Sequence, residues 1–244
     1  MADSLRDKVA VVTGGSRGIG FAIARALVER GASVTITGTK EKPLMTASRE
    51  LESAARGGAV MAQTADVRKY EDVERALNAA ASRFGGIDVL VNNAGVGVFT
   101  SVEHMSVEQW HDVIETNLTG VFYCCRAALP HLRKRGGGWI INISSLSGKN
   151  AFADGAAYCA SKSGLNAFSE SLMQEVRHEG IRVAYVMPGS VKTGFSGQTP
   201  SGEDWKLAPE DVAEVVIDLL AHPSRSLPSR VEIRPARPPI STKR

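Results

Sequence analysis

The stretch KVAVVTGGSRGIGFAIARALVERG, residues 8–31, decides the fold. It opens with a short apolar run rich in valine, passes through a glycine-rich turn, and continues as an amphipathic run that stops at Gly31. Strand, turn and helix in this order predict the first half of a βαβ unit.

The rest of the chain repeats this alternation. Amphipathic stretches of helical length separate the short apolar runs, and such spacing favours parallel strands, because each crossover must pass over a face of the sheet. We therefore expect an α/β protein with a single-domain Rossmann fold, built on a doubly wound seven-stranded parallel sheet with helices on both faces. The expected strands lie within residues 8–14, 33–38, 59–67, 87–95, 138–145, 181–190 and 230–235.

Helix ends are marked at several places. Ser106 followed by Gln109 predicts a capping box, and Gly31, Gly136 and Gly180 stand just past helical runs. No internal repeat interrupts the pattern.

The chain has 244 residues, of which 43% are hydrophobic, and no long linker divides it. We expect one domain over residues 1–235 and an extended or disordered basic tail over residues 236–244. The first residues carry neither a secretory signal nor a membrane span, so the expected location is cytoplasmic, with no membrane partner.

The charge and the cysteine spacing argue against a nucleic-acid-binding protein and against a zinc protein. The net charge of +3 is small, and the five cations within residues 230–244 favour a solvated tail over a nucleic-acid surface. Cys124, Cys125 and Cys159 lack the spacing of a zinc site, so we expect reduced core thiols and no metal.

The glycine turn predicts a dinucleotide site. Gly14, Gly18 and Gly20 allow a tight turn and close ligand approach, and the helix that follows offers free N–H groups to a pyrophosphate. The spacing G-x-x-x-G-x-G differs from the common G-x-G-x-x-G, so a turn without a ligand is the alternative. The motif NNAG, residues 92–95, lies at the end of the fourth expected strand and favours the ligand.

The second expected strand indicates which dinucleotide would bind. It ends in Gly38, Thr39 and Lys40, without the acidic residue that holds the ribose of NAD. Arg17 and Lys40 could pair with a 2′-phosphate, which favours NADP(H) over NAD(H). Solvation of both cations is the alternative.

Tyr158 and Lys162, in YCASK, stand one helical turn apart and leave the same face of a helix. A free phenol has a pKa near 10, and an ammonium in a sheltered cleft could lower it toward neutrality. Ser145, or the neighbouring Ser144, ends the fifth expected strand, where a hydroxyl could meet a substrate carbonyl. A chance surface pair is the alternative for the tyrosine and lysine.

Five motifs in order resemble the short-chain dehydrogenase/reductase family. They are TGGSRGIG at 13–20, NNAG at 92–95, the serine at 145, YCASK at 158–162 and PGSVKT at 188–193. The resemblance runs from residue 8 to about residue 220. Among its members the chain is most similar to the 3-oxoacyl thioester reductases, through NNAGV and GSVKT, although it lacks the glycine-rich ending of those enzymes.

The resemblance implies the roles of the site residues. Tyr158 would protonate the carbonyl oxygen, Lys162 would lower the tyrosine pKa and hold the nicotinamide ribose, and Ser145 would bond the same oxygen. Asn117 would bend its helix and hold a water in a proton relay, whereas the residues alone would leave it facing solvent. The implied cofactor contacts are Gly14, Ser16, Arg17, Gly18, Ile19, Gly20, Thr39, Lys40, Asp66, Val67, Asn93, Ala94, Gly95, Tyr158, Lys162, Pro188, Gly189, Val191 and Thr193. Asp66 could also be a helix N-cap.

The expected activity is an NADPH-dependent reduction of a ketone, with a 3-oxoacyl thioester as one candidate, to a secondary alcohol. A dehydrogenase of a secondary alcohol, sugar or steroid-like substrate is the alternative, and a non-catalytic dinucleotide-sensing protein is the outside class.

Residues 194–207 are too few for two lid helices, so we expect an open cleft. Its substrate-facing apolar residues would be Val96, Phe99, Phe195 and Trp205, and packing in the core or lid is the alternative for each. Small residues on the Tyr158 helix suggest packing against a second subunit, in a homodimer or homotetramer. They are Ala156, Ala157, Ala160, Ser161 and Gly164.

Overall fold

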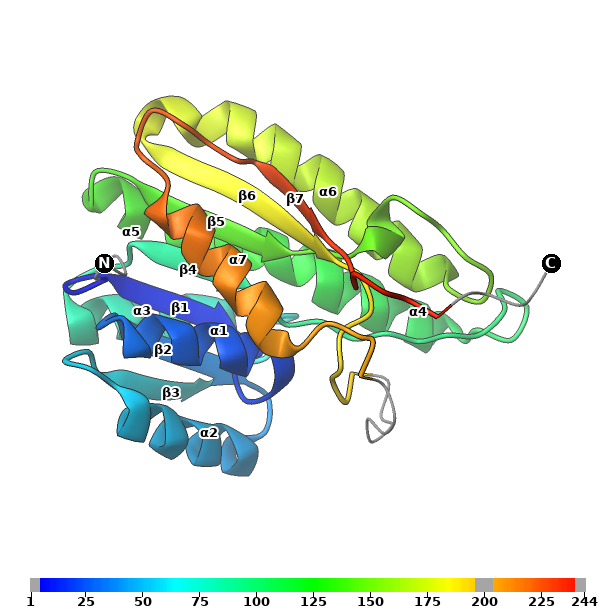
Figure 1. Ribbon diagram of the computed structural model, residues 1–244, viewed down its shortest axis with the longest axis horizontal. Coiled ribbons are helices and arrows are strands. Elements are labelled where there is room, and N and C mark those ends of the chain that lie inside the picture. Colours follow the sequence, from blue (N-terminus) through cyan, green and yellow to red (C-terminus); the bar gives the residue numbers. More distant parts are fainter. Residues whose placement is uncertain (1–4, 196–203, 240–244) are drawn as a thin grey trace.

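Seven parallel strands form one sheet in a computed structural model that describes residues 5–195 and 204–239 (Figure 1). The strand order is β3-β2-β1-β4-β5-β6-β7. The predicted seven-stranded parallel sheet is confirmed. The strands are β1 (Val9–Thr13), β2 (Ser33–Gly38), β3 (Val60–Thr64), β4 (Val89–Asn92), β5 (Gly138–Ile143), β6 (Ile181–Pro188) and β7 (Arg230–Ile233).

Helices cover both faces of the sheet, as predicted (Figure 1). On one face pack α1 (Gly18–Glu29), α2 (Glu41–Ala54) and α7 (Pro209–Ala221). On the other face pack α3 (Tyr70–Phe84), α5 (Gly120–Lys134) and α6 (Ala156–Val176). Short elements complete the chain: α4 (Val107–Ile114), the π-helix η1 (Glu115–Thr119), and the 3-10 turns η2 (Leu146–Gly148) and η3 (Arg177–Glu179).

The central strand β1 shows why the apolar runs are nearly continuous. All five of its residues are buried, because alternate side chains enter the two different cores. Val12 packs with α1 and α2, whereas Val11 packs with the α3 and α5 side. A half-exposed strand would have alternated with polar residues.

Helix ends follow the predicted signals. Ser106 and Gln109 form a reciprocal capping box at α4. Gly31, Gly136 and Gly180 have φ of +92°, +79° and +75°, the left-handed conformation that ends a helix at little cost for glycine.

The stretch 106–136 has the pattern of one amphipathic run but is not one α-helix. It divides into α4, one π-helical turn, and α5. A π-turn inserts an extra residue into the hydrogen-bond ladder and rotates the side chains that follow it. Asn117 lies within this turn.

The sheet brings the predicted motifs to one edge. Strand order reverses between β1 and β4, which are direct neighbours, and this is where α/β sheets open a crevice beyond their carboxyl ends. The glycine turn after β1, the motif after β4, the serines after β5 and the segment after β6 all leave the sheet at that end.

The structure changes two expectations that concern the surface of the protein, the small residues of α6 and the C-terminal cations. Ala157 and Ser161, predicted to face another subunit, are fully buried inside this one, while Ala160 is exposed. Within the predicted basic cluster, Arg230 and Arg234 both pair with Glu232.

The three cysteines are free and buried, as predicted. In the portions covered by residues 5–195 and 204–239, none of the helices has the length and apolar character needed to cross a membrane.

Candidate active site

The glycine turn is packed against the loop after β4. A Cβ on Gly20 would lie 2.3 Å from Asn93 Nδ2 and 2.5 Å from the Gly14 carbonyl oxygen. Gly14 has φ +65°, and a Cβ there would lie 2.9 Å from the Cα of Ala94. Glycine is therefore favoured at Gly20 by space, and at Gly14 by both space and conformation.

Thr13 and Asn93 join these two loops. Thr13 Oγ1 accepts hydrogen bonds from the backbone N–H groups of Asn93 and Ala94, both at 3.0 Å. The Asn93 amide donates to the carbonyls of Thr13 and Gly14. Asn93, predicted as a cofactor contact, thus has its side-chain nitrogen engaged in shaping the turn.

The turn faces two further predicted residues across an open cradle. A Cβ on Gly18 would lie 3.4 Å from the Thr193 methyl, and one on Gly95 would lie 3.8 Å from Lys162 Nζ. Gly18 thus stands beside Thr193, and Gly95 stands beside Lys162, so that each glycine borders another predicted cofactor residue. These residues fit a nicotinamide dinucleotide, which needs close backbone approach at its pyrophosphate.

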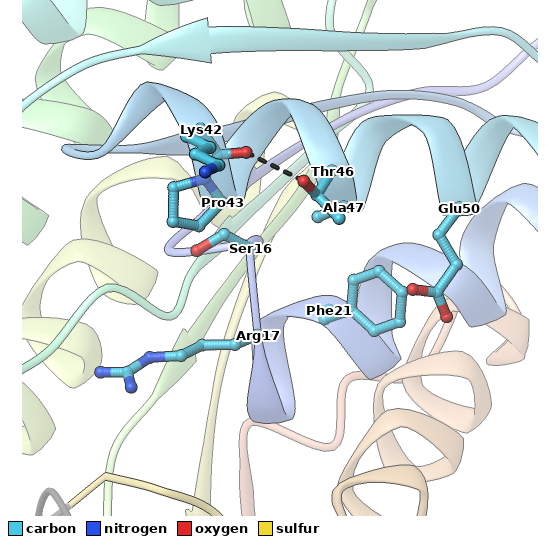
Figure 2. Close-up of a pocket in the computed structure, with 8 residues that line it drawn as sticks. All are labelled: Ser16, Arg17, Phe21, Lys42, Pro43, Thr46, Ala47 and Glu50. Carbon is cyan, nitrogen blue, oxygen red and sulfur yellow. Dashed lines mark hydrogen bonds between the residues drawn. The ribbon is translucent and has the colours of Figure 1, made fainter.

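A shallow hollow of about 440 Å³ lies between the glycine turn and α2. Figure 2 shows Arg17 on one side of it, Lys42 above, and Glu50 at the far end beside Phe21. The full lining is Ser16, Arg17, Phe21, Lys42, Pro43, Thr46, Ala47 and Glu50.

Arg17 and Lys42 both line the hollow, together with Glu50. Thr39 and Lys40, the predicted cofactor contacts, are exposed just before α2 and do not line it. Their contact with a cofactor stays a prediction, and Lys42, in the first turn of α2, is a further cation near the turn.

Asp66, predicted to contact the cofactor or to cap a helix, is bound to a neighbour. Both of its carboxylate oxygens accept from Arg68, which also bridges to Asp112. This hydrogen bond holds the pKa of Asp66 below its usual range. The N-cap of α3 is Lys69, so the capping alternative is wrong.

The remaining predicted cofactor contacts are structural neighbours of the cradle. Val67 is buried against Gly120, and Ile19 packs on the core. Pro188 ends β6, the Gly189 N–H donates to the Ile233 carbonyl, and Val191 bridges to Leu207.

Asn117 is fully buried, which corrects the solvent-facing interpretation. Its amide nitrogen donates to the Val96 carbonyl and to Ser161 Oγ, and its amide oxygen accepts from the Val96 N–H. The π-turn points the side chain inward, so that it joins the loop after β4 to the helix that carries Tyr158. A π-helical turn interrupts the helix at this residue, and the bend that the resemblance implies stays a prediction.

The two candidate serines have separate environments. Ser144 is buried and its hydroxyl donates to Asn166 and to the Lys162 carbonyl. Ser145 is partly exposed, its hydroxyl donates to Ser147 Oγ at 3.1 Å, and its side chain lowers the pKa of the Tyr158 phenol. Of the two, Ser145 is the hydroxyl that a carbonyl substrate could reach beside Tyr158.

Burial raises the pKa of Tyr158, and its interaction with Ser145 opposes this only in part. The Lys162 ammonium donates to the Ile143 carbonyl at 2.9 Å and lies 5.8 Å from the centre of the phenol ring. The net shift is therefore set by burial, and the lowering of the tyrosine pKa by Lys162 stays a prediction.

Lys162 is a buried cation, with 5% of its surface exposed. Burial lowers its pKa to about 8. It has no ion pair within residues 5–195 and 204–239, although a buried ammonium is expensive without one.

Phenylalanine rings surround the phenol. Phe99 lies 5.5 Å from the Tyr158 ring, Phe195 lies 5.8 Å from it, and Phe152 lies 6.0 Å from Phe99. Phe99 and Phe195 were predicted, but Phe152 was missed, because nothing in the sequence shows that its loop meets residues 96–100. The other two predicted residues have other contacts. The Val96 N–H donates to Asn117, and the Lys206 ammonium lies 5.7 Å from the centre of the Trp205 ring. The prediction that 194–207 lacks lid helices lies partly outside the described residues, at 196–203.

The family model for short chain dehydrogenases matches residues 8–204. An uncharacterised oxidoreductase of Staphylococcus epidermidis is 36% identical over 231 residues, which cover 95% of this chain and 98% of that protein.

Two solved structures are also similar. An alcohol dehydrogenase of the archaeon Thermococcus sibiricus, complexed with 5-hydroxy-NADP, has 34% identity and a TM-score of 0.88, covering 96% of this chain and 99% of that one. A metagenomic short-chain oxidoreductase in complex with NADP has 38% identity and a TM-score of 0.84, with the same coverage.

The match covers most of the chain, and the tyrosine, lysine, serine and asparagine lie together at the carboxyl edge of the sheet. The protein therefore belongs to the short-chain dehydrogenase/reductase family and is an NAD(P)-dependent oxidoreductase.

Proposed function

We propose that the protein reduces a ketone to a secondary alcohol, with NADPH as its cofactor and Tyr158 as the proton donor. The observation that carries this proposal is the environment of the phenol. The phenol stands between the Phe99 and Phe195 rings, with the buried Lys162 ammonium one helical turn away. Burial raises the pKa of Tyr158, which keeps the phenol in the acid form that a proton donor needs.

A bound nicotinamide dinucleotide would supply the hydride. Gly14, Gly18 and Gly20 would admit its pyrophosphate, and Gly95, Lys162 and Thr193 would border its nicotinamide half. The cradle described above supports this placement.

The protein's own residues have three tasks around the carbonyl oxygen. Tyr158 donates its proton to the oxygen as negative charge develops there, and Ser145 donates a hydrogen bond to the same atom. The positive charge of Lys162 stabilises the phenolate that remains. Donors fixed in advance at a developing oxyanion are a large source of rate enhancement.

Asn117 acts by position. Its three hydrogen bonds fix the loop at Val96 and the helix at Ser161, on either side of Lys162. The family resemblance adds a water relay toward the lysine, which stays a prediction.

NADPH rather than NADH is favoured by the charges at the hollow. Arg17 and Lys42 border it, and no acidic residue ends β2. Two similar structures hold NADP or a derivative of it. We expect Arg17→Gln to raise the KM for NADPH about tenfold and to leave the KM for NADH unchanged. Separate Lys40→Gln and Lys42→Gln variants show which lysine contributes. Equal effects on both cofactors would contradict the NADPH assignment.

The activity itself is tested by following NADPH absorbance with a panel of ketones that includes a short 3-oxoacyl thioester. Tyr158→Phe should retain NADPH binding and lose at least about a hundredfold in kcat. Tyr123→Phe, a tyrosine on α5 outside the ring cluster, is the matched control. Retained turnover in the Tyr158 variant would remove the phenol from the mechanism.

A homodimer or homotetramer is part of the proposal, as is a cytoplasmic location. Outward-facing Ala160 on α6 and exposed Phe122 on α5, whose ring meets Phe168, support close packing of a second copy. Light scattering that gives a mass of about 26 kDa, the mass of one chain, would contradict it.

A further inference from the structure

We infer that the carbonyl substrate carries an aromatic ring, and that Phe99, Phe152 and Phe195 receive that ring beside Tyr158. This inference rests on the proposed ketone reduction and names its substrate class as aryl ketones.

Phe99, Phe152 and Phe195 form a wall of three rings that stays largely exposed among the described residues. Phe99, Phe152 and Phe195 are 44%, 48% and 39% exposed. Large apolar side chains gathered with so much exposed area mark a binding surface, because solvent contact of such a cluster is costly. Within residues 5–195 and 204–239, their ring partners are one another and the catalytic phenol.

Two glycines make room for these rings. A Cβ on Gly97 would lie 2.8 Å from the Phe195 ring and 2.9 Å from the Phe99 ring. A Cβ on Gly155 would lie 2.6 Å from the Phe152 ring. The backbone is thus bare at both points where a ring approaches it, which leaves space for the rings.

A backbone hydrogen bond holds the two loops together. The Thr100 N–H donates to the Asp154 carbonyl at 2.8 Å, which couples the loop after β4 to the loop before α6. Phe99 directly precedes Thr100, and Phe152 lies two residues before Asp154. The wall is therefore preorganised, and preorganised contacts lose less entropy on binding.

The ring geometry favours an aromatic guest. Phe99 meets Tyr158 edge-on at 67° and Phe195 meets it at 57°, so the rings already adopt the inclined arrangements that aromatic groups prefer. A sugar would leave its hydroxyls facing these rings without hydrogen bonds, which is unfavourable. A thioester with a short alkyl chain would leave part of the wall uncovered.

The test compares acetophenone with cyclohexyl methyl ketone, which has the same carbon skeleton but no aromatic ring. The two ketones differ in intrinsic reactivity, so the measured quantity is how their ratio of kcat/KM changes between variants. Phe99→Leu and Phe152→Leu keep apolar volume and remove the ring. We expect each to lower the acetophenone preference at least about fivefold, mainly through KM. Phe84→Leu, on α3, is the matched control and should leave the ratio unchanged.

Binding is measured separately in the Tyr158→Phe protein with NADPH, by broadening of the acetophenone NMR signals. If adding Phe99→Leu to the Tyr158→Phe protein reduces this broadening, the result supports binding at the aromatic wall independently of turnover. An unchanged ratio in both leucine variants, or a clear preference for the 3-oxoacyl thioester or a sugar, would overturn the inference while leaving ketone reduction intact. If no ketone in the panel is reduced and acetophenone still binds at the wall, the proposed function fails and the aromatic site stands.

Discussion

The two ends of the central sheet bury charge in opposite ways. At the amino end, the Asp88 carboxylate accepts from Arg135 at 3.1 Å, from the Val9 N–H at 3.0 Å and from Lys8 at 3.4 Å. At the carboxyl end, the buried Lys162 ammonium donates to a backbone carbonyl, that of Ile143, and pairs with no carboxylate among the described residues. One buried charge is compensated and the other is not.

This difference separates stability from chemistry. A buried carboxylate that is paired and hydrogen-bonded supports the folded state, whereas a buried ammonium without a counter-charge opposes it. A chain keeps such an ammonium where the charge acts on a reaction. The amino end therefore holds the sheet together, and the carboxyl end accepts a loss of stability in exchange for a reactive cation.

The largest expected effect is on activity at the carboxyl end. Lys162→Met should lower kcat by about a thousandfold, because the phenolate left by Tyr158 loses its stabilising charge. Under the same steady-state assay with NADPH, Asp88→Asn should stay within about twofold of the parent protein. Comparable losses in both variants would show that the two ends do not divide their roles.

Lys162 shows which features of the site could be predicted from the sequence and which could not. YCASK on a helix predicted a tyrosine and a lysine on one face, and the structure places them so. The burial of both groups, which dominates their pKa values, could not be predicted, and neither could the bond from the ammonium to the Ile143 carbonyl, which belongs to a strand nineteen residues earlier. A distant hydrogen-bond partner of this kind leaves no local pattern in the sequence.

Local signals, by contrast, predicted most of the fold. Apolar runs at the right spacing predicted the seven strands, and Ser106 with Gln109 predicted its capping box. Asn117 was buried only by the π-turn, whose extra residue is not visible as a periodicity. Phe152 was missed because it meets the phenylalanine rings through a contact between two loops, which depends on how those loops pack.

The next effect is the pH dependence of stability. The folded pKa of Lys162 is about 8, below the ordinary value of 10.5, so the folded state binds fewer protons than the unfolded state between these values. Stability therefore rises with pH across this window, and below pH 8 the whole penalty, roughly 3 kcal/mol, is present.

Urea unfolding of the parent and of Lys162→Met at pH 7.5 and pH 10 measures this penalty. The variant should be the more stable at pH 7.5, and its advantage should shrink by about 2 kcal/mol at pH 10. Taking the difference between the two proteins cancels the titration of the buried cysteines, whose pKa values are raised by burial. An advantage that does not change with pH would refute the uncompensated charge.

At the amino end, the expected effect is on stability alone. Asp88→Asn should lower the free energy of unfolding by about 2 kcal/mol, because Arg135 and the Val9 N–H lose a charged acceptor. Arg135 is partly exposed and can recover some hydration, which keeps the loss below that of a fully buried pair. Asp218→Asn, at an exposed position on α7, is the matched control and should be neutral. Chemical denaturation at pH 7 measures both, and a neutral Asp88 variant would mean that the amino end is held by packing.

The smallest effect concerns two left-handed glycines, one at each end. Gly85 ends α3 with φ +83°, and a Cβ there would meet no described atom within 4 Å, whereas Gly18 has φ +58° and faces Thr193 across the cradle. Alanine at either position should cost about 1 kcal/mol of stability, since the backbone strain is the same in kind. Only Gly18→Ala should also weaken NADPH binding, measured by fluorescence titration, because its methyl group enters the surface that the pyrophosphate would approach. Equal affinity in the two variants would place the cofactor away from this turn. Reduced affinity in both variants would show that backbone strain alone, even at Gly85, disturbs the cofactor site. The two ends of the sheet would then not divide stability and chemistry between them.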